Sequence, residues 1–271
     1  MMLLISPTRM LFLQSKTNNF FKLKCRLLRS AFLFFMVLIS SCVNEKEPVA
    51  LIVSGHTTIK GNRGTSTASG KWENEFNDEI VNLFSDKANQ IDGIEYVIAP
   101  STQNLTLQDK VDLSKKVKPD LYIEIHHNSG QQQDIDRAKS EGDNSAVWEW
   151  LKGFCILYYD DAEGKESKFP KESLKFAELL SEQMIKEGFV PNKYHAAKQG
   201  MELLPGDKGI YNRVKPNSLF VLRNAVSPAV LLECGFVINP KEEKILSTPE
   251  TRQRIVNAIN CAISEYFNKK D

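Results

Sequence analysis

The chain of 271 residues has little cysteine, and its five cysteines do not stand at the paired spacings typical of structural metal sites. Cys155, Cys234 and Cys261 lie in the body of the chain, where an odd number argues against a complete disulfide framework. Two of them sit within apolar runs, so we expect buried free thiols. Neighbouring side chains of a strand face opposite ways, so Cys234 is expected to point away from Glu233.

Acidic residues are absent from residues 1–30, which carry six lysines and arginines. An apolar stretch at 31–39 follows, too short to cross a bilayer as a helix, and small residues come after it. This order is typical of a signal peptide, here residues 1–41. The run from Leu38 to Cys42 resembles a bacterial lipobox, which implies cleavage before Cys42, its lipidation and a tether over 42–49. We therefore expect a lipid-anchored protein of the cell envelope, facing the periplasm or the cell exterior.

Excess positive charge is absent once this N-terminal segment is set aside. The residues after position 41 hold 29 basic and 34 acidic side chains, a net charge of −5, whereas the whole chain has +1. No basic surface is thus expected, and the sequence predicts no nucleic-acid partner. Roughly 229 residues follow Cys42, enough for one α/β domain with a sizeable core.

Apolar runs and helical spacings alternate along residues 50–268, which predicts a single α/β domain. The alternation favours a mostly parallel sheet with helices on both faces. Strands are expected at 50–54, 94–99, 121–126, 154–159, 219–222 and 229–232. Helices are expected at about 73–88, 106–117, 172–187, 240–246 and 249–267, the second opened by a capping box of Thr106 and Asp109.

Residues 129–150 interrupt this alternation with a polar stretch, which we interpret as an inserted loop. The stretch ends in Trp148 and Trp150. These tryptophans either pack on the edge of the sheet or belong to a lid over the cleft, since aromatic faces can stack on sugar rings. The sequence alone does not decide between the two interpretations.

Histidine is scarce, and three of the four histidines stand where apolar runs end. His56 follows one such run, and the pair His126 and His127 closes another. Ligands bind at the carboxyl ends of strands in open α/β sheets, so imidazoles converging there predict a metal site. The fourth histidine, His195, lies in a polar stretch and is expected to be exposed to solvent.

Carboxylates near these strand ends would complete such a site. A hydrolytic zinc site needs three protein ligands and one open position for water. Glu73, Glu75 and Glu124 are candidates for the third ligand, and spacing alone does not separate them. Glu233 ends a further apolar run and supplies a base for the water.

Four blocks of the sequence carry a family resemblance when taken in order. They are Gly55-His56, Glu73 to Asn77, Asp120 to Asn128, and Pro228 to Pro240. Together they resemble the signature blocks of the zinc-dependent N-acetylmuramoyl-L-alanine amidases of the amidase-3 type, from about residue 50 to 267. The last block is the most specific, because it combines an apolar strand, a glutamate, a Gly-Phe pair and Asn-Pro.

The resemblance implies one zinc ion held by His56, Glu73 and His126, with Glu233 as the catalytic carboxylate. Glu73 is preferred to Glu75 because the family has an asparagine four residues after the ligand, as Asn77 is here. The implied fold is a twisted six-stranded α/β sheet with flanking helices.

The implied reaction is hydrolysis of the amide bond between N-acetylmuramic acid and the L-alanine of the stem peptide in peptidoglycan. Arg223 and Asn224 are weaker candidates for substrate contact, and a protein activator of unknown identity is a further expected partner. A non-catalytic peptidoglycan-binding or regulatory lipoprotein on the same fold is the alternative function. Such a protein would be expected to lack at least one of the four site residues, and all four are present.

Two positions beside His126 depart from the family pattern. His127 stands where the family commonly has a small residue, and we expect it to be a bystander in the core or on the surface. Glu124 stands where the family usually has serine, and in a strand it faces the same side as His126. Glu124 would orient the imidazole of His126 as a hydrogen-bonding partner, compete as a metal ligand, or make the local electrostatic field more negative.

Overall fold

The computed structural model describes residues 46–161, 168–197, 201–213 and 219–268. The expected signal peptide and the lipobox cysteine, Cys42, lie outside these residues. Residues 47–271 form one compact unit. None of the helices in the described ranges combines the length and the apolar character that a membrane span requires.

Seven strands form one sheet in the described residues, in the order β2-β1-β3-β7-β4-β6-β5. Strands β2, β1, β3 and β7 run parallel, whereas β4 runs antiparallel to β7 and parallel to β6, and β5 is antiparallel to β6. The parallel half therefore brings the carboxyl ends of β1, β3 and β7 to one edge. The strands are β1 (Val49–Ser54), β2 (Glu95–Ala99), β3 (Leu121–Asn128), β4 (Cys155–Tyr158), β5 (Met201–Leu203), β6 (Ile210–Arg213) and β7 (Ala229–Phe236).

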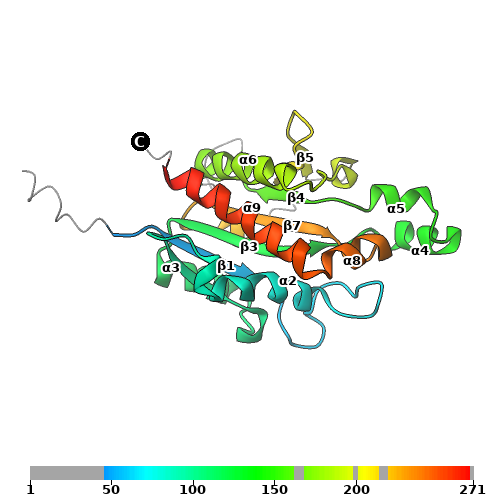
Figure 1. Cartoon of the computed structure of the whole chain (residues 1–271), viewed down its shortest axis with the longest axis horizontal. Helices are drawn as coiled ribbons and strands as arrows, with labels where there is room; N and C mark the ends of the chain where they lie inside the picture. The colour runs from blue at the N-terminus through cyan, green and yellow to red at the C-terminus, as the bar shows by residue number, and fades with distance from the viewer. Residues whose placement is uncertain (1–45, 162–167, 198–200, 214–218, 269–271) are drawn as a thin grey trace, which may run out of the picture. The chain divides into compact units, whose positions relative to one another are not determined.

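Helices cover both faces of this sheet, which confirms the expected fold class. One face packs on α2, α6 and α9, and Figure 1 shows α6 and α9 side by side there. The other face carries α3 and α7. The α-helices are α2 (Glu73–Val81), α3 (Leu107–Val117), α4 (Gln132–Glu141), α5 (Ala146–Trp150), α6 (Pro170–Lys186), α7 (Phe220–Arg223), α8 (Pro240–Leu246) and α9 (Pro249–Asn268). Short 3-10 turns are η1 (Asn82–Ser85), η2 (Lys87–Asn89), η3 (Ser101–Gln103) and η4 (Tyr194–Ala197).

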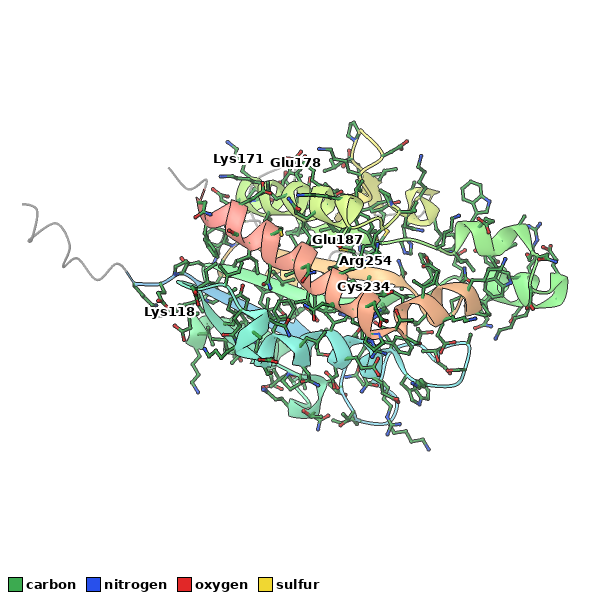
Figure 2. All side chains as sticks on the ribbon, viewed as in Figure 1. Lys118, Lys171, Glu178, Glu187, Cys234 and Arg254 are labelled. Atoms are coloured by element: carbon green, nitrogen blue, oxygen red, sulfur yellow. The ribbon has the colours of Figure 1, made fainter. Side chains whose placement is uncertain are left out.

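Burial explains why these segments form these elements. Strands β1 and β3 are buried on both sides, as their continuous apolar runs predict for parallel strands between helices. In α2, Phe76 and Ile80 are four residues apart and point together into the core. Glu187 follows the last residue of α6, and its carboxylate lies 3.6 Å from the guanidinium of Arg254 near the start of α9 (Figure 2). Both ends of that pair are partly exposed, so it adds little to the apolar packing.

The capping box at the start of α3 is confirmed. The Thr106 hydroxyl accepts a hydrogen bond from the Asp109 backbone N–H at 3.1 Å, and the Asp109 carboxylate accepts one from the Thr106 backbone N–H at 3.0 Å. These bonds satisfy two N–H groups that have no partner within the helix. The helix then ends at Val117, as its sequence predicts.

Three expectations about single segments are wrong. Residues 129–150 hold α4 and α5 rather than an irregular loop, because Ile135, Val147 and Trp148 share a small core. The apolar run at 219–222 belongs to α7 rather than to a strand, since so short a run has no diagnostic period. With this strand absent and two unexpected strands present, β5 and β6, the sheet has seven strands instead of six.

The two tryptophans of this segment have different surroundings. Trp148 is buried and its ring N–H donates to the Gly142 carbonyl at 3.2 Å. Trp150 is 63% exposed at the end of α5. The packing interpretation therefore holds for Trp148, and only Trp150 is free to contact a ligand.

Candidate active site

His56, Glu73 and His126 converge at the carboxyl ends of β1 and β3. His56 Nε2 lies 3.1 Å from Glu73 Oε1, and His126 Nδ1 lies 3.0 Å from the same oxygen. One donor atom from each of the three residues fits within 4.8 Å of the others, whereas Glu75 is exposed and outside this cluster. The arrangement matches the mixed nitrogen and oxygen donor set of a zinc site with an open fourth position.

Two glycines leave the space in which these donors meet. A Cβ on Gly55 would lie 2.5 Å from the His126 ring, and a Cβ on Gly64 would lie 2.4 Å from Glu73 Oε2. Thr65 donates its backbone N–H to that Oε2 at 3.0 Å, which leaves Oε1 to face the histidines. His56 itself has a φ of 63°, a left-handed conformation that is uncommon for a side chain of its size and occurs at functional sites.

Glu233 lies directly beside His126 on the neighbouring strand. The two residues are partners in the β3–β7 register, so their side chains face the same cleft. The Oε2 atom of Glu233 is buried and has no hydrogen-bond partner among the described residues. Burial raises the pKa of Glu233 to about 7, which suits a proton acceptor at neutral pH. Cys234 points to the other face and is buried in the main core, as expected.

Glu124 also lies on the cleft face but has other partners. Its Oε1 lies 2.6 Å from Lys110 Nζ and 3.2 Å from His126 Nε2. Its Oε2 accepts a hydrogen bond from the Tyr122 hydroxyl at 3.0 Å. Burial opposes ionisation, yet Lys110 and His126 hold the pKa of Glu124 well below its usual range. Glu124 is therefore a buried carboxylate behind the imidazole and stands outside the converging donors.

The protonation of His126 follows from its two acidic neighbours. Burial by itself lowers the pKa of an imidazole, but hydrogen bonds to Glu124 and Glu73 raise the pKa of His126 to about 10. Despite its burial, Glu73 has a pKa below the usual range, because His126 and His56 both hydrogen-bond to its carboxylate. A metal ion must therefore displace a proton to bind here.

The other two histidines lie away from the donor cluster. His127 is buried on the opposite face, where its Nδ1 lies 2.8 Å from Asn77 Oδ1, so it is a bystander as expected. His195 is also buried, with Nε2 2.9 Å from Asn128 Oδ1 and its ring stacked on Phe236. The expectation that His195 is exposed is wrong, because its polar segment packs back onto the end of β3.

Arg223 and Asn224 are not brought to the donors. They line a cavity of about 440 Å³ together with Gln108 and Lys115. The donors open instead into a cavity of about 470 Å³, lined by His56, His126, Glu124, Lys110, Leu107 and Phe220 among others. The two candidates for substrate contact therefore face a different hollow.

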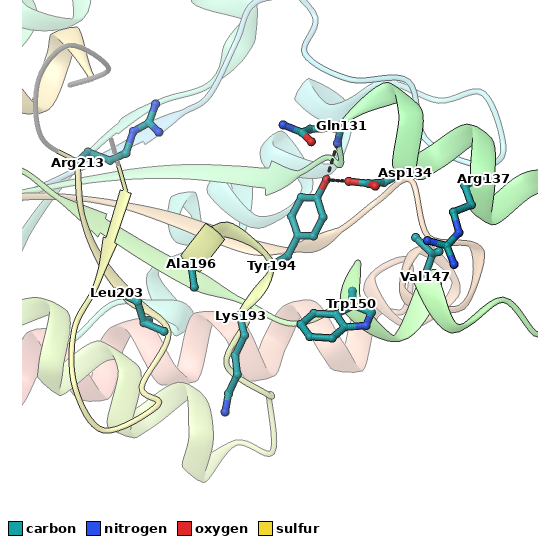
Figure 3. Close-up of a pocket in the computed structure, with 10 residues that line it drawn as sticks. All are labelled: Gln131, Asp134, Arg137, Val147, Trp150, Lys193, Tyr194, Ala196, Leu203 and Arg213. Atoms are coloured by element: carbon teal, nitrogen blue, oxygen red, sulfur yellow. Dashed lines mark hydrogen bonds between the residues drawn. The ribbon is translucent and has the colours of Figure 1, made fainter. Parts of the chain in front are cut away.

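A further cavity of about 800 Å³ adjoins the inserted helices (Figure 3). Arg213 and Trp150 line it, together with Tyr194, whose hydroxyl accepts from the Gln131 N–H at 2.8 Å and bonds Asp134. Arg213 is close enough to Glu233 for its charge to favour the ionised carboxylate, and its Nε is buried without a partner among the described residues. Sequence reasoning missed Arg213. The available signal was its place two residues after the apolar pair Ile210-Tyr211.

Comparison with known proteins places these features in a family. The N-acetylmuramoyl-L-alanine amidase model named Amidase_3 matches residues 50–265. An uncharacterized cell wall amidase of Bacillus anthracis is 29% identical over 165 residues, which cover 61% of this chain and 24% of that protein. The N-acetylmuramoyl-L-alanine amidase AmiA of Escherichia coli is 25% identical over 171 residues, which cover 60% of this chain and 57% of that protein.

A solved structure agrees with the fold. The N-acetylmuramoyl-L-alanine amidase of Clostridium difficile 630 superposes with a TM-score of 0.61 at 19% identity, covering 84% of this chain and all of that one (100%). The chain spans only about a quarter to three fifths of the length of the two relatives named above.

Proposed function

Because the chain belongs to the N-acetylmuramoyl-L-alanine amidase family, we propose that it hydrolyses the amide between N-acetylmuramic acid and the L-alanine of the peptidoglycan stem peptide. The observation that carries this proposal is the register of β3 and β7. It sets Glu233, whose Oε2 is buried without a partner among the described residues, beside the His–Glu–His donor cluster.

His56, Glu73 and His126 would hold one zinc ion. Their donor atoms are an imidazole nitrogen, a carboxylate oxygen and a second imidazole nitrogen, which suits zinc and leaves a position for water. When bound, zinc lowers the pKa of its water towards neutrality and polarises the amide carbonyl. The glycines at 55 and 64 support this assignment, because any larger residue would fill the space between the donors.

Glu233 would move the proton during the reaction. Its carboxylate accepts a proton from the attacking water and then donates it to the nitrogen of the leaving L-alanine. In the metal-free chain burial raises the pKa of Glu233 to about 7, and burial of this kind favours return of the proton to the leaving nitrogen. The apolar part of the cleft lining, which includes Leu107 and Phe220, would lower the local dielectric around the charges that develop.

Digestion of purified sacculi tests this function. The chain from residue 43 onward should release stem peptides from sacculi, and removal of the metal with a chelator should abolish the release. Readdition of zinc should restore it. The non-catalytic alternative predicts that the zinc-loaded protein binds sacculi and leaves both sacculi and short muropeptides intact.

We propose further that Cys42 carries a lipid anchor that holds the enzyme in the cell envelope. The support is the order of basic segment, short apolar stretch and lipobox-like residues before it. Several acyl chains on one residue bind a membrane firmly, at about 0.8 kcal/mol per buried methylene. Mass spectrometry of the membrane-extracted protein checks this, and Cys42→Ala should release the protein from the membrane fraction.

A further inference from the structure

A buried ion pair stands behind the donor cluster. Lys110 of α3 and Glu124 of β3 meet at 2.6 Å, and their side chains are only 3% and 4% exposed. Glu124 has both oxygens satisfied, by Lys110 and His126 on one and by Tyr122 on the other. A buried charge pair is stabilised when its remaining hydrogen-bonding atoms also find partners. Here both Glu124 oxygens have partners, and Lys110 donates to the Ser54 carbonyl as well as to Glu124.

We propose that Glu124 and Lys110 are positioning residues that fix the His126 ring with Nδ1 toward the metal and Nε2–H toward Glu124. The proposal rests on the zinc centre of the proposed function. His126 Nδ1 lies 3.0 Å from Glu73 Oε1, whereas Nε2 lies 3.2 Å from Glu124 Oε1. Both ring nitrogens face a carboxylate oxygen, but only Glu73, on the Nδ1 side, belongs to the donor cluster. A bound metal would therefore take the Nδ1 lone pair and leave the hydrogen of the neutral ring on Nε2, facing Glu124.

Lys110 also contacts the strand that carries His56, the other proposed histidine ligand. Its Nζ donates to the carbonyl of Ser54 at 3.0 Å as well as to Glu124. Ser54 is two residues before His56, and it is paired in register with Ile125, the residue before His126. One ammonium group thus joins the ends of both strands that present histidine to the metal.

The geometry also separates this role from direct ligation. Glu124 Oε1 is already in contact with an ammonium nitrogen at 2.6 Å. A second cation on that oxygen would be repelled by Lys110. Glu124 therefore acts on the metal through the His126 ring, as carboxylates beside zinc-bound histidines commonly do.

The tautomer of His126 is the most direct test. The chain has four histidines, so the imidazole nitrogens of the zinc-loaded protein can be assigned by long-range proton–nitrogen NMR. The expected spectrum has His126 bound to zinc through Nδ1 with a hydrogen on Nε2. A spectrum with Nε2 bound to zinc and the hydrogen on Nδ1 would overturn the proposal.

Zinc affinity supplies a second readout that needs no substrate. Glu124→Gln keeps the shape and an accepting oxygen but lacks the charge, and it should weaken zinc binding about 10-fold or more in chelator competition. Glu124→Ser restores the residue usual in the family and should weaken zinc binding by up to about 100-fold. The matched control is Asp112→Asn, a change of an exposed carboxylate on α3, the helix that carries Lys110, and it should leave the zinc affinity unchanged.

A neutral double variant separates positioning from general stability. If a single substitution unfolds the protein by leaving one charge alone, Lys110→Met with Glu124→Gln removes both charges and should fold. Its zinc affinity should remain at least about 10-fold below that of the unaltered chain. Affinity equal to that of the unaltered chain, in either Glu124→Gln or the double variant, would refute the proposal.

The positioning role and the amidase activity can fail separately in these experiments. If zinc binds through Nδ1 and the Glu124 variants weaken it, but sacculi stay intact, the amidase activity is refuted and the positioning role stands. If the unaltered chain does not bind zinc, the positioning role is refuted together with the metal centre.

Discussion

His126 and His127 are adjacent in sequence, yet they occupy two different chemical environments. His126 faces the cleft between two carboxylates, which raise its pKa to about 10 against the effect of burial. His127 faces the core on the other side of β3, where burial lowers its pKa to about 3 and Asn77 is its partner. The alternation of a strand thus separates a charged ligand-binding face from a neutral structural face within one residue.

Strand β7 likewise has one face toward the cleft and one toward the core, and the residues of the cleft face are the candidates for function. Glu233 faces the cleft, and the next residue, Cys234, is buried among core side chains. Substitutions on the cleft face should therefore alter metal binding and turnover, whereas those on the core face should alter the free energy of unfolding. Four predictions test this division, from the largest expected effect to the smallest.

Removal of either adjacent histidine gives the sharpest contrast. His126→Ala should lose zinc, with affinity lower by at least about 100-fold, since loss of a mere orienting partner already costs up to that much. His127→Ala should keep zinc but lose about 1–3 kcal/mol of unfolding free energy, because Asn77 Oδ1 is left buried without its partner. Chelator competition and denaturant unfolding measure the two effects. Zinc loss in both variants would contradict the assignment of His127 to the core face.

The pair on β7 should behave in the same way. Glu233→Gln should lower kcat by about 10²- to 10⁴-fold, the usual contribution of a general base, while zinc stays bound. Cys234→Ala should keep its activity and lose about 1 kcal/mol of stability from the small cavity. Steady-state release of stem peptides, with metal content measured on the same samples, checks both. A Glu233→Gln enzyme with unaltered kcat would remove the proposed base.

Activity should depend on pH through Glu233. The base must be ionised to accept a proton, so kcat/KM should fall as the pH falls through its pKa, by about tenfold per pH unit below it. Burial sets that pKa at about 7 without metal, and the charge of zinc should bring it down toward the ordinary 4.5. The acid limb should therefore lie between these values. In Glu233→Gln the limb should be absent, and a persisting limb would assign it to another group.

The smallest effect on activity is expected in the inserted segment, at the exposed one of its two tryptophans. Trp150→Ala removes a 63% exposed indole that lines the cavity in Figure 3, and it should raise KM a few-fold without changing stability. Trp148→Ala removes a buried ring and should cost about 3–5 kcal/mol of stability. Kinetics on muropeptides together with thermal unfolding compare the two. Unchanged KM in Trp150→Ala would exclude a substrate contact by that side chain.

The sequence predicted best those features that depend only on residues close together along the chain. The capping box of Thr106 and Asp109 needs only residues three apart, and its helix is correct from start to end. The strand ends that carry His56, His126 and Glu233 follow from apolar runs of ordinary length. These features are local, so no knowledge of distant contacts is required to find them.

Features that depend on distant contacts were less accessible. The burial of His195 requires Asn128 and Phe236, which are far away along the chain. The run at 219–222 is too short to distinguish helix from strand, and packing on the sheet decides for α7. Likewise, nothing in the spacing pairs Lys110 with Glu124, because their meeting depends on how α3 lies across β1 and β3.

The loop between β1 and α2 is hydrogen-bonded to residues that follow β7, far later in the sequence. Ser69 donates its backbone N–H and its hydroxyl to the carboxylate of Glu243, at 2.9 and 2.6 Å, and Ala68 donates to the carbonyl of Val237 at 3.1 Å. During synthesis these partners emerge long after the loop that connects His56 to Glu73. The loop between His56 and Glu73 therefore gains these contacts only after β7 and α8 have been synthesised, so the two ends of this loop wait for a much later part of the chain.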